Sequence, residues 1–89
     1  MLYYYKIYAK VECPFCVEVI NKMNEHGFDH SLTLVDKSTD YFELIKKKYD
    51  HHTVPIVLKV SKVSNIYEVV GGCDDFKKML VLEGYEEQC

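Results

Sequence analysis

The chain has 89 residues, of which 48% are hydrophobic and 13% aromatic, so it can form one domain with a core but has no room for a second. Its formal net charge of −3 argues against nucleic acid as the main partner, because phosphate binding needs an excess of Lys and Arg. No stretch approaches the roughly 18 apolar residues of a membrane span, and the N-terminus lacks the basic region and cleavage site of a signal peptide.

The first part of the chain predicts a strand, a helix and a second strand. Residues Leu2 to Tyr8 are apolar and aromatic but too few for a helix, which predicts a buried strand. From Pro14 to about His26 the apolar residues recur with a helical period, and Gly27 ends this helix. Its inward-facing residues are Cys16, Val19, Ile20 and Met23. Apolar and polar residues then alternate over 31–35, which predicts the second strand.

A second helix and a hairpin follow. Ser38 or Asp40 can cap the helix. The residues expected on its inward face are Tyr41, Leu44, Ile45 and Tyr49. Pro55 precedes a short apolar run at 56–60, and a second run at 66–70 is separated from it by turn-forming residues. This pattern predicts two antiparallel strands joined by a turn.

Gly71-Gly72 ends the hairpin, and Asp74 or Asp75 can cap a last helix. Its expected inward-facing residues are Phe76, Met79 and Leu80. The predicted order of elements is β-α-β-α-β-β-α. A strand, helix and strand at the start imply a right-handed parallel pair, whereas the hairpin adds antiparallel strands. We therefore expect an α/β fold in which one four-stranded mixed sheet carries three helices.

The clearest chemical motif is Cys13-Pro14-Phe15-Cys16. Pro14 suits the first position of a helix, which places Cys13 at or beside the N-cap, where free N–H groups favour a thiolate. Cys16 lies one turn later on the buried face, close enough to form a disulfide with Cys13. One accessible thiolate that attacks and one shielded thiol that resolves are what thiol–disulfide exchange requires.

Two other readings of the cysteine pair remain. Without a signal peptide we expect the cytoplasm, or the host cytoplasm for a viral or phage protein, where a close pair indicates redox chemistry or a metal. By number, zinc could be bound by Cys13, Cys16, His51 and His52. Adjacent histidines on an extended segment point in opposite directions, so we expect no metal. Ordinary buried thiols would leave the proline between the cysteines unexplained.

The chain resembles the dithiol glutaredoxin family over essentially its whole length. The residues that carry the resemblance, in order and at about the family's separations, are Lys10, Cys13-Pro14-Phe15-Cys16, Thr53-Val54-Pro55 and Gly71-Gly72-Cys73-Asp74-Asp75. It implies a thioredoxin-like fold, Cys13 and Cys16 as catalytic residues, and glutathione as the reducing co-substrate. Protein disulfides and glutathione mixed disulfides would be the substrates, with ribonucleotide reductase one candidate client, and we expect a monomer.

The resemblance also implies a glutathione groove. The Val54-Pro55 bond is expected to be cis, which exposes the backbone of Val54 to the cysteinyl part of glutathione. Cys73 and Asp74 would bind the γ-glutamyl end at a helix start, where a carboxylate is favourable. The full set of expected glutathione-binding residues is Lys10, Phe15, Thr53, Val54, Pro55, Gly72, Cys73 and Asp74. Lys10 would attract the glycine carboxylate, and Phe15 would line the groove.

The sequence departs from the family pattern at the cationic end of this groove. His52 stands where an Arg often precedes the Thr-Val-Pro motif, and Phe15 replaces a frequent Tyr. A second cationic contact to the glycine carboxylate would then come from protonated His52 or from Lys46 or Lys47. Cys73 has two readings, a regulatory third thiol or a small residue beside the groove, and the second is favoured.

Two alternative functions remain. One is a glutaredoxin-like redoxin reduced by thioredoxin reductase, against which Lys10 and residues 71–75 speak. The other is an iron–sulfur or zinc carrier. Glutaredoxins specialised for clusters usually replace the second cysteine of the pair with Ser, whereas this chain keeps Cys16.

Overall fold

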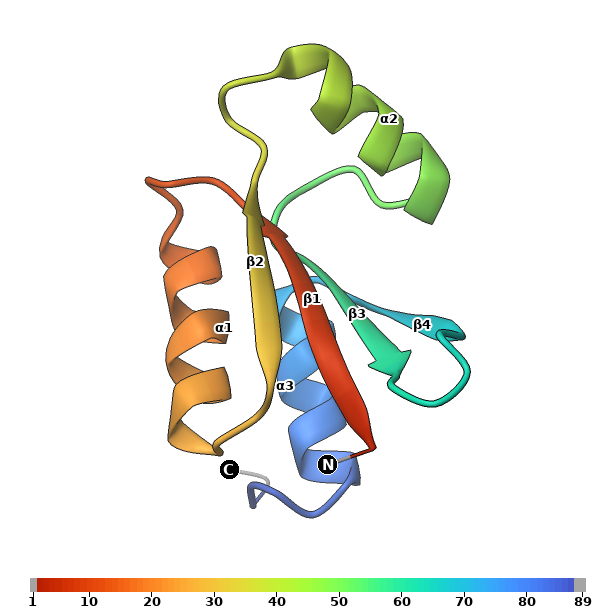
Figure 1. The fold of residues 1–89 in the computed structure, drawn as a ribbon. Coiled ribbons are helices and arrows are strands. Elements are labelled where there is room, and N and C mark those ends of the chain that lie inside the picture. The colour runs from red at the N-terminus through yellow and green to blue at the C-terminus, as the bar shows by residue number, and fades with distance from the viewer. Residues whose placement is uncertain (1, 88–89) are drawn as a thin grey trace.

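The computed structural model describes residues 2–87, which form one mixed sheet and three helices (Figure 1). The elements are β1 (Tyr3–Ala9), α1 (Pro14–Glu25), β2 (His30–Leu34), α2 (Thr39–Tyr49), β3 (Ile56–Ser61), β4 (Tyr67–Gly71) and α3 (Cys73–Leu82). The strand order is β2-β1-β3-β4, with β1 parallel to β2 and antiparallel to β3, and β3 antiparallel to β4. The predicted α/β fold and order of elements are therefore confirmed. None of the described helices is long and apolar enough to cross a membrane.

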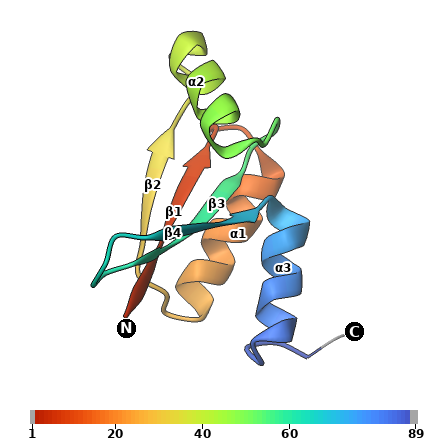
Figure 2. The same ribbon diagram turned by 90° about the vertical axis from the view of Figure 1, so that its right-hand side faces the viewer.

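The two faces of the sheet are buried by different helices. On one face the side chains of Tyr5, Ile7 and Val57 pack against α1 and α3, and on the other Tyr8 and Leu58 pack against α2. Alternate residues of β1 and β3 thus enter opposite cores, as the two-residue period of a strand requires. In Figure 2, α1 and α3 lie on one side of the sheet and α2 lies across its upper end.

The predicted inward face of α2 is partly wrong. Ile45 and Tyr49 are buried as expected, but the side chain of Leu44 is 65% exposed and that of Tyr41 is 38% exposed. Phe42 packs against the core instead. Because α2 covers only one corner of the sheet, its contact face is narrow, and the residues next to that face remain in solvent. The cap prediction for this helix is confirmed at Ser38, whose hydroxyl accepts the N–H of Tyr41 at 3.2 Å.

The start of α3 also differs from the prediction. Gly72 is the N-cap, and Asp75 lies within the first turn, where its carboxylate accepts the Gly72 N–H at 3.1 Å. Gly71 adopts a φ of +118°, and a Cβ there would collide with the Asp75 carboxylate. The helix therefore begins earlier than Asp74 or Asp75 would allow as caps. The two glycines permit this tight entry, because only glycine combines that φ with such close approach.

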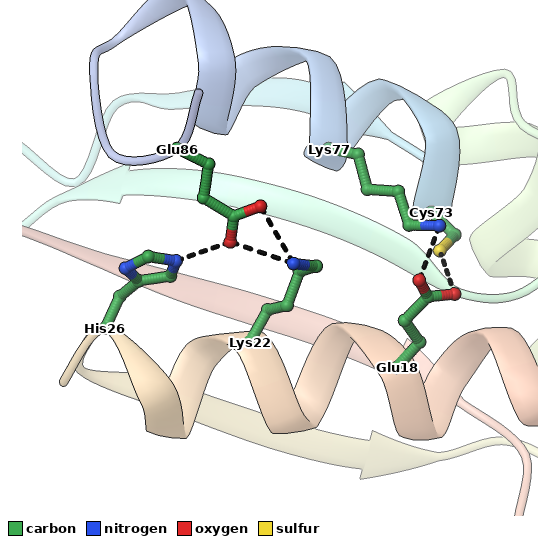
Figure 3. A network of polar contacts seen from close by, with 6 residues as sticks. All are labelled: Glu18, Lys22, His26, Cys73, Lys77 and Glu86. Carbon is green, nitrogen blue, oxygen red and sulfur yellow. Dashed lines mark hydrogen bonds and ion pairs between the residues drawn. The ribbon is translucent and has the colours of Figure 1, made fainter. Parts of the chain in front are cut away.

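Two carboxylates join α1 to the C-terminal part of the chain (Figure 3). Glu86 accepts hydrogen bonds from Lys22 Nζ at 2.8 Å and from the Nε2 N–H of His26 at 2.6 Å. Nearer the start of both helices, Glu18 pairs with Lys77 at 2.5 Å. The segment after α3 is thus held against the last turn of α1.

We expect Glu86→Gln to lower the free energy of unfolding by up to about 1 kcal/mol at neutral pH, as for other partly exposed ion pairs. His26 and then Lys22 hold the pKa of Glu86 below its ordinary value of 4.5. A carboxyl whose pKa is lower in the folded state stabilises the protein above the unfolded-state value, and this contribution is lost as pH falls through the folded-state value.

Urea unfolding at about pH 7 and again at about pH 3 should therefore show a smaller difference between Glu86→Gln and wild type at the lower pH. The matched control is Glu87→Gln, since Glu87 is the exposed neighbour of Glu86. If both variants lost the same free energy of unfolding, the effect would come from the change in net charge and not from the contacts of Glu86.

Candidate active site

Cys13 and Cys16 lie at the start of α1 with unequal exposure. Cys13 is the N-cap residue in an extended conformation, and its Sγ accepts the N–H of Cys16 at 3.3 Å. Pro14 occupies the first helical turn, as predicted. Cys13 is partly exposed and Cys16 is only 1% exposed, and both are free thiols. The positions predicted for an attacking and a resolving cysteine are therefore present.

The two sulfur atoms of the pair lie in different surroundings. Burial, followed by the hydrogen bond with Cys13, raises the pKa of the Cys16 thiol to about 12. Cys16 is therefore a neutral thiol near pH 7. Cys13 lies at the N-cap of α1, where its sulfur faces the free N–H groups of the helix start. The pair thus has one accessible sulfur suited to attack and one shielded sulfur that retains its proton.

A groove of about 250 Å³ lies beside this pair. Its walls come from the first turn of α1, the loop between α2 and β3, and the start of α3. The lining residues are Phe15, His51, Thr53, Val54, Pro55, Gly72, Cys73, Asp74 and Asp75. The Val54–Pro55 peptide bond is cis, as the resemblance implied. The structure therefore brings together every expected glutathione-binding residue except Lys10.

Lys10 lies outside the lining of the groove, near α2. Its Nζ is 4.7 Å from the ring centroid of Phe42, and Lys46 Nζ is 4.6 Å from the same centroid. Lys46 also pairs with Glu43 at 2.7 Å. Two ammonium groups therefore converge on one aromatic ring at the end of the molecule that carries α2. Of the residues considered for the second cationic contact, Lys46 is the one that the structure places with Lys10.

The histidine that lines the groove is His51, whereas the family pattern favoured His52 for a cationic contact there. His52 is exposed and does not line the groove. The intervening turn explains the difference: Asp50 ends α2 in the left-handed conformation, with φ 50° and ψ 49°, and the chain then turns His51 inward. A left-handed residue is usual after a helix, but it is commonly Gly or Asn, so the aspartate concealed the signal.

The residues of the alternative zinc site do not converge. Within residues 2–87, the group of three or more potential ligands that the geometry brings within 4.8 Å of one another is Glu25, His26 and Glu86, at the far end of α1. Lys22 already donates to both Glu86 oxygens there. The set formed by Cys13, Cys16, His51 and His52 has no such arrangement.

Cys73 is the first residue of α3 and contributes to the groove wall. Its thiol is buried and donates to Glu18 Oε2 at 3.4 Å, while Lys77 holds the other oxygen of the same carboxylate (Figure 3). Burial, followed by the Glu18 hydrogen bond, raises the pKa of Cys73 to about 11. A thiol that retains its proton is a poor nucleophile, which supports the reading of Cys73 as a small wall residue.

Comparison with known proteins agrees with this geometry. The sequence model of the glutaredoxin family matches residues 5–61, more than half of the chain. A wheat glutaredoxin is 25% identical with a TM-score of 0.68, and the match covers 90% of this chain and 69% of that one. A dithiolic glutaredoxin from Trypanosoma brucei brucei is 26% identical with a TM-score of 0.66, covering 90% and 78%.

A buckwheat glutaredoxin, solved as a glutathione complex, is 19% identical, has a TM-score of 0.71, and covers 92% of this chain and 71% of its own. This likeness shows the shared thioredoxin-like fold. No curated protein matches the chain. The family match spans both the cysteine pair and the cis-proline loop. The chain therefore belongs to the glutaredoxin family, whose fold and cysteine chemistry are those of thiol–disulfide oxidoreductases.

Proposed function

We propose that the protein reduces disulfides at the expense of glutathione, with Cys13 as the attacking thiol and Cys16 as the resolving thiol. The observation that carries this proposal is the groove that joins the cis-proline loop to the start of α3 beside the cysteine pair. The buckwheat protein of the same fold, which was solved as a glutathione complex, supports it. The geometry suits a small peptide-like thiol.

The reaction begins when the Cys13 thiolate attacks one sulfur of a substrate disulfide. A mixed disulfide forms, and the other substrate sulfur leaves as a thiolate and takes up a proton. Cys16 then loses its proton, attacks the Cys13 sulfur and releases the second substrate thiol. Two molecules of glutathione reduce the resulting Cys13–Cys16 disulfide in turn and leave as glutathione disulfide, so two electrons pass from glutathione to the substrate.

Substrates that carry glutathione need only Cys13. Its thiolate attacks the glutathione sulfur and releases the reduced protein, and a second glutathione then regenerates Cys13. Glutathione would lie along the groove, its cysteinyl part beside Val54 and its γ-glutamyl carboxylate at the start of α3, where unpaired helix N–H groups favour an anion. Asp74 would bind the ammonium group. Lys10 and Lys46 would attract the glycine carboxylate.

A coupled assay tests the proposal. With glutathione, glutathione reductase, NADPH and a small mixed disulfide, we expect NADPH oxidation that depends on the protein. Turnover with NADPH and thioredoxin reductase, and none with glutathione, would instead support the redoxin alternative. Visible absorption of the anaerobically purified protein would support an iron–sulfur carrier.

The proposal also covers the compartment, the oligomeric state and the client proteins. We place the protein in a reducing cytoplasm, or in that of a host, acting as a monomer. Its clients would be disulfide-bearing or glutathionylated proteins, with ribonucleotide reductase as a candidate. Gel filtration of the reduced protein checks the monomer. A reconstituted ribonucleotide reductase assay checks the client.

A further inference from the structure

His51 presents an unusual buried nitrogen to the candidate groove. The side chain lines the groove, yet its Nε2 is inaccessible and is the one buried side-chain polar atom without a hydrogen-bond partner among residues 2–87. A buried polar atom without a partner is costly, and such atoms call for an explanation. The backbone N–H of His51 is used, since it donates to the Lys46 carbonyl at 3.1 Å. Only the ring nitrogen Nε2 of His51 is therefore left to explain.

The position of this nitrogen relates it to α3. A Cβ on Gly72 would lie 3.3 Å from His51 Nε2, so the nitrogen lies directly against the N-cap of that helix. The N–H of Gly72 is occupied by Asp75, at 3.1 Å. The N–H groups of the next residues, Cys73 and Asp74, belong to the helix start that would receive an anion. A charge on His51 would therefore act on any anion bound there.

The charged and titratable groups around His51 come from α3, from the end of α2 and from the loop that follows α2. Those that line the groove with it are Cys73, Asp74 and Asp75 of α3. Those near it in the chain are Lys46, Lys47, Lys48 and Tyr49 of α2, Asp50 and His52. The start of α3 carries partial positive charge, whereas Asp74 and Asp75 carry negative charge, and a bound carboxylate would add to that negative charge.

We propose that His51 is a positioning residue that takes up a proton when a carboxylate binds at the start of α3, so that recognition of the γ-glutamyl group is coupled to pH. This inference rests on the proposed glutathione groove. Histidine changes charge between about pH 5 and 8, and a free carboxylate stays ionised throughout that range. Affinity therefore rises as the pH falls. His52 is exposed and lies outside the groove lining, so it makes no such contribution.

The test uses S-methylglutathione, which keeps both carboxylates but has no thiol to exchange. Isothermal titration calorimetry should show the affinity of the wild-type protein rising about tenfold between pH 8 and pH 5.5. His51→Gln keeps a polar side chain of similar reach and should remove this pH-dependent gain. The matched control is His52→Gln, which should keep the wild-type pH profile. Circular dichroism checks that each variant is folded.

Any pH dependence that does not involve His51 is common to all three proteins, so the comparison isolates His51. A second measurement needs no variant: titrations in buffers of different ionisation enthalpy should show proton uptake when the wild-type protein binds the ligand near pH 6.5. The inference is overturned if no proton is taken up, or if His51→Gln keeps the wild-type pH profile. Wild-type binding with no pH dependence would overturn it while leaving the groove intact. No binding at any pH would overturn the proposed function as well.

Discussion

Cys13→Ser is expected to abolish thiol–disulfide exchange, with turnover falling by at least about a thousandfold, as when other enzymes lose their nucleophile. The Cys13 sulfur is the accessible member of the pair and sits at the start of α1. A serine hydroxyl does not ionise near neutral pH and cannot form a mixed disulfide. The coupled glutathione assay measures the loss. Turnover within about tenfold of wild type would show that another thiol attacks.

Cys16→Ser should separate the two reactions. The mixed disulfide on Cys13 would no longer be resolved from within the protein, so we expect reduction of protein disulfides to be lost. Removal of glutathione from a small mixed disulfide should persist, because a second glutathione completes that reaction without Cys16. Burial makes Cys16 inaccessible to external disulfides, so the substitution removes only the resolving step. Retention of both activities would show that Cys16 is not the resolving thiol.

Phe76→Ala is expected to lower the free energy of unfolding by about 3–5 kcal/mol. Phe76 is fully buried, and its ring packs edge-on against Tyr5 of β1 with the centroids 6.1 Å apart. The substitution removes apolar surface and leaves a cavity between α3 and the sheet. Since small domains have a total stability of about 5–15 kcal/mol, this change removes a large part of it. Urea unfolding followed by circular dichroism measures the difference.

The matched control is Leu82→Ala at the end of the same helix. Leu82 is 85% exposed, so its truncation should change stability by no more than about 0.5 kcal/mol. Helix propensity cannot cause a loss at either position, because Ala is the best helix former, so a similar cost at both would show that the effect of Phe76→Ala does not come from burial of the ring. A cost below about 1 kcal/mol at Phe76 would show that α3 is not anchored through this ring.

The buried face of a helix could be predicted from the sequence where the period of its apolar residues alone decides which side chains are buried. In α1 the residues expected to face inward, Cys16, Val19 and Met23, are fully buried, and Ile20 packs beside them. The helix crosses the sheet along its length, so its whole apolar face is used. In α2 the same reasoning failed at Leu44, because periodicity gives the direction of a side chain and not the extent of the surface opposite it.

The candidate site likewise has parts that could be predicted from the sequence and parts that could not. The resemblance to the dithiol glutaredoxins implied one groove formed by Phe15, the Thr53-Val54-Pro55 segment and the start of α3, and the structure places these residues together. The choice between His51 and His52 depended on one backbone conformation, the left-handed Asp50. That residue is not the glycine that usually marks such a turn. The resemblance to the dithiol glutaredoxins implied that Lys10 lies in the groove, but its side chain extends toward Phe42.

The contacts of Glu18 determine which wall of the groove can be displaced. Glu18 lies two residues after Cys16 and binds Cys73 and Lys77, so the cysteine pair and the start of α3 are fastened to each other. The opposite wall, residues 50–55, continues from α2, which rests on a single corner of the sheet. Segments with fewer buried contacts open at lower free energy. Substrates of different bulk would therefore be accommodated by displacement of the cis-proline loop, while the spacing between the Cys13 sulfur and the start of α3 stays constant.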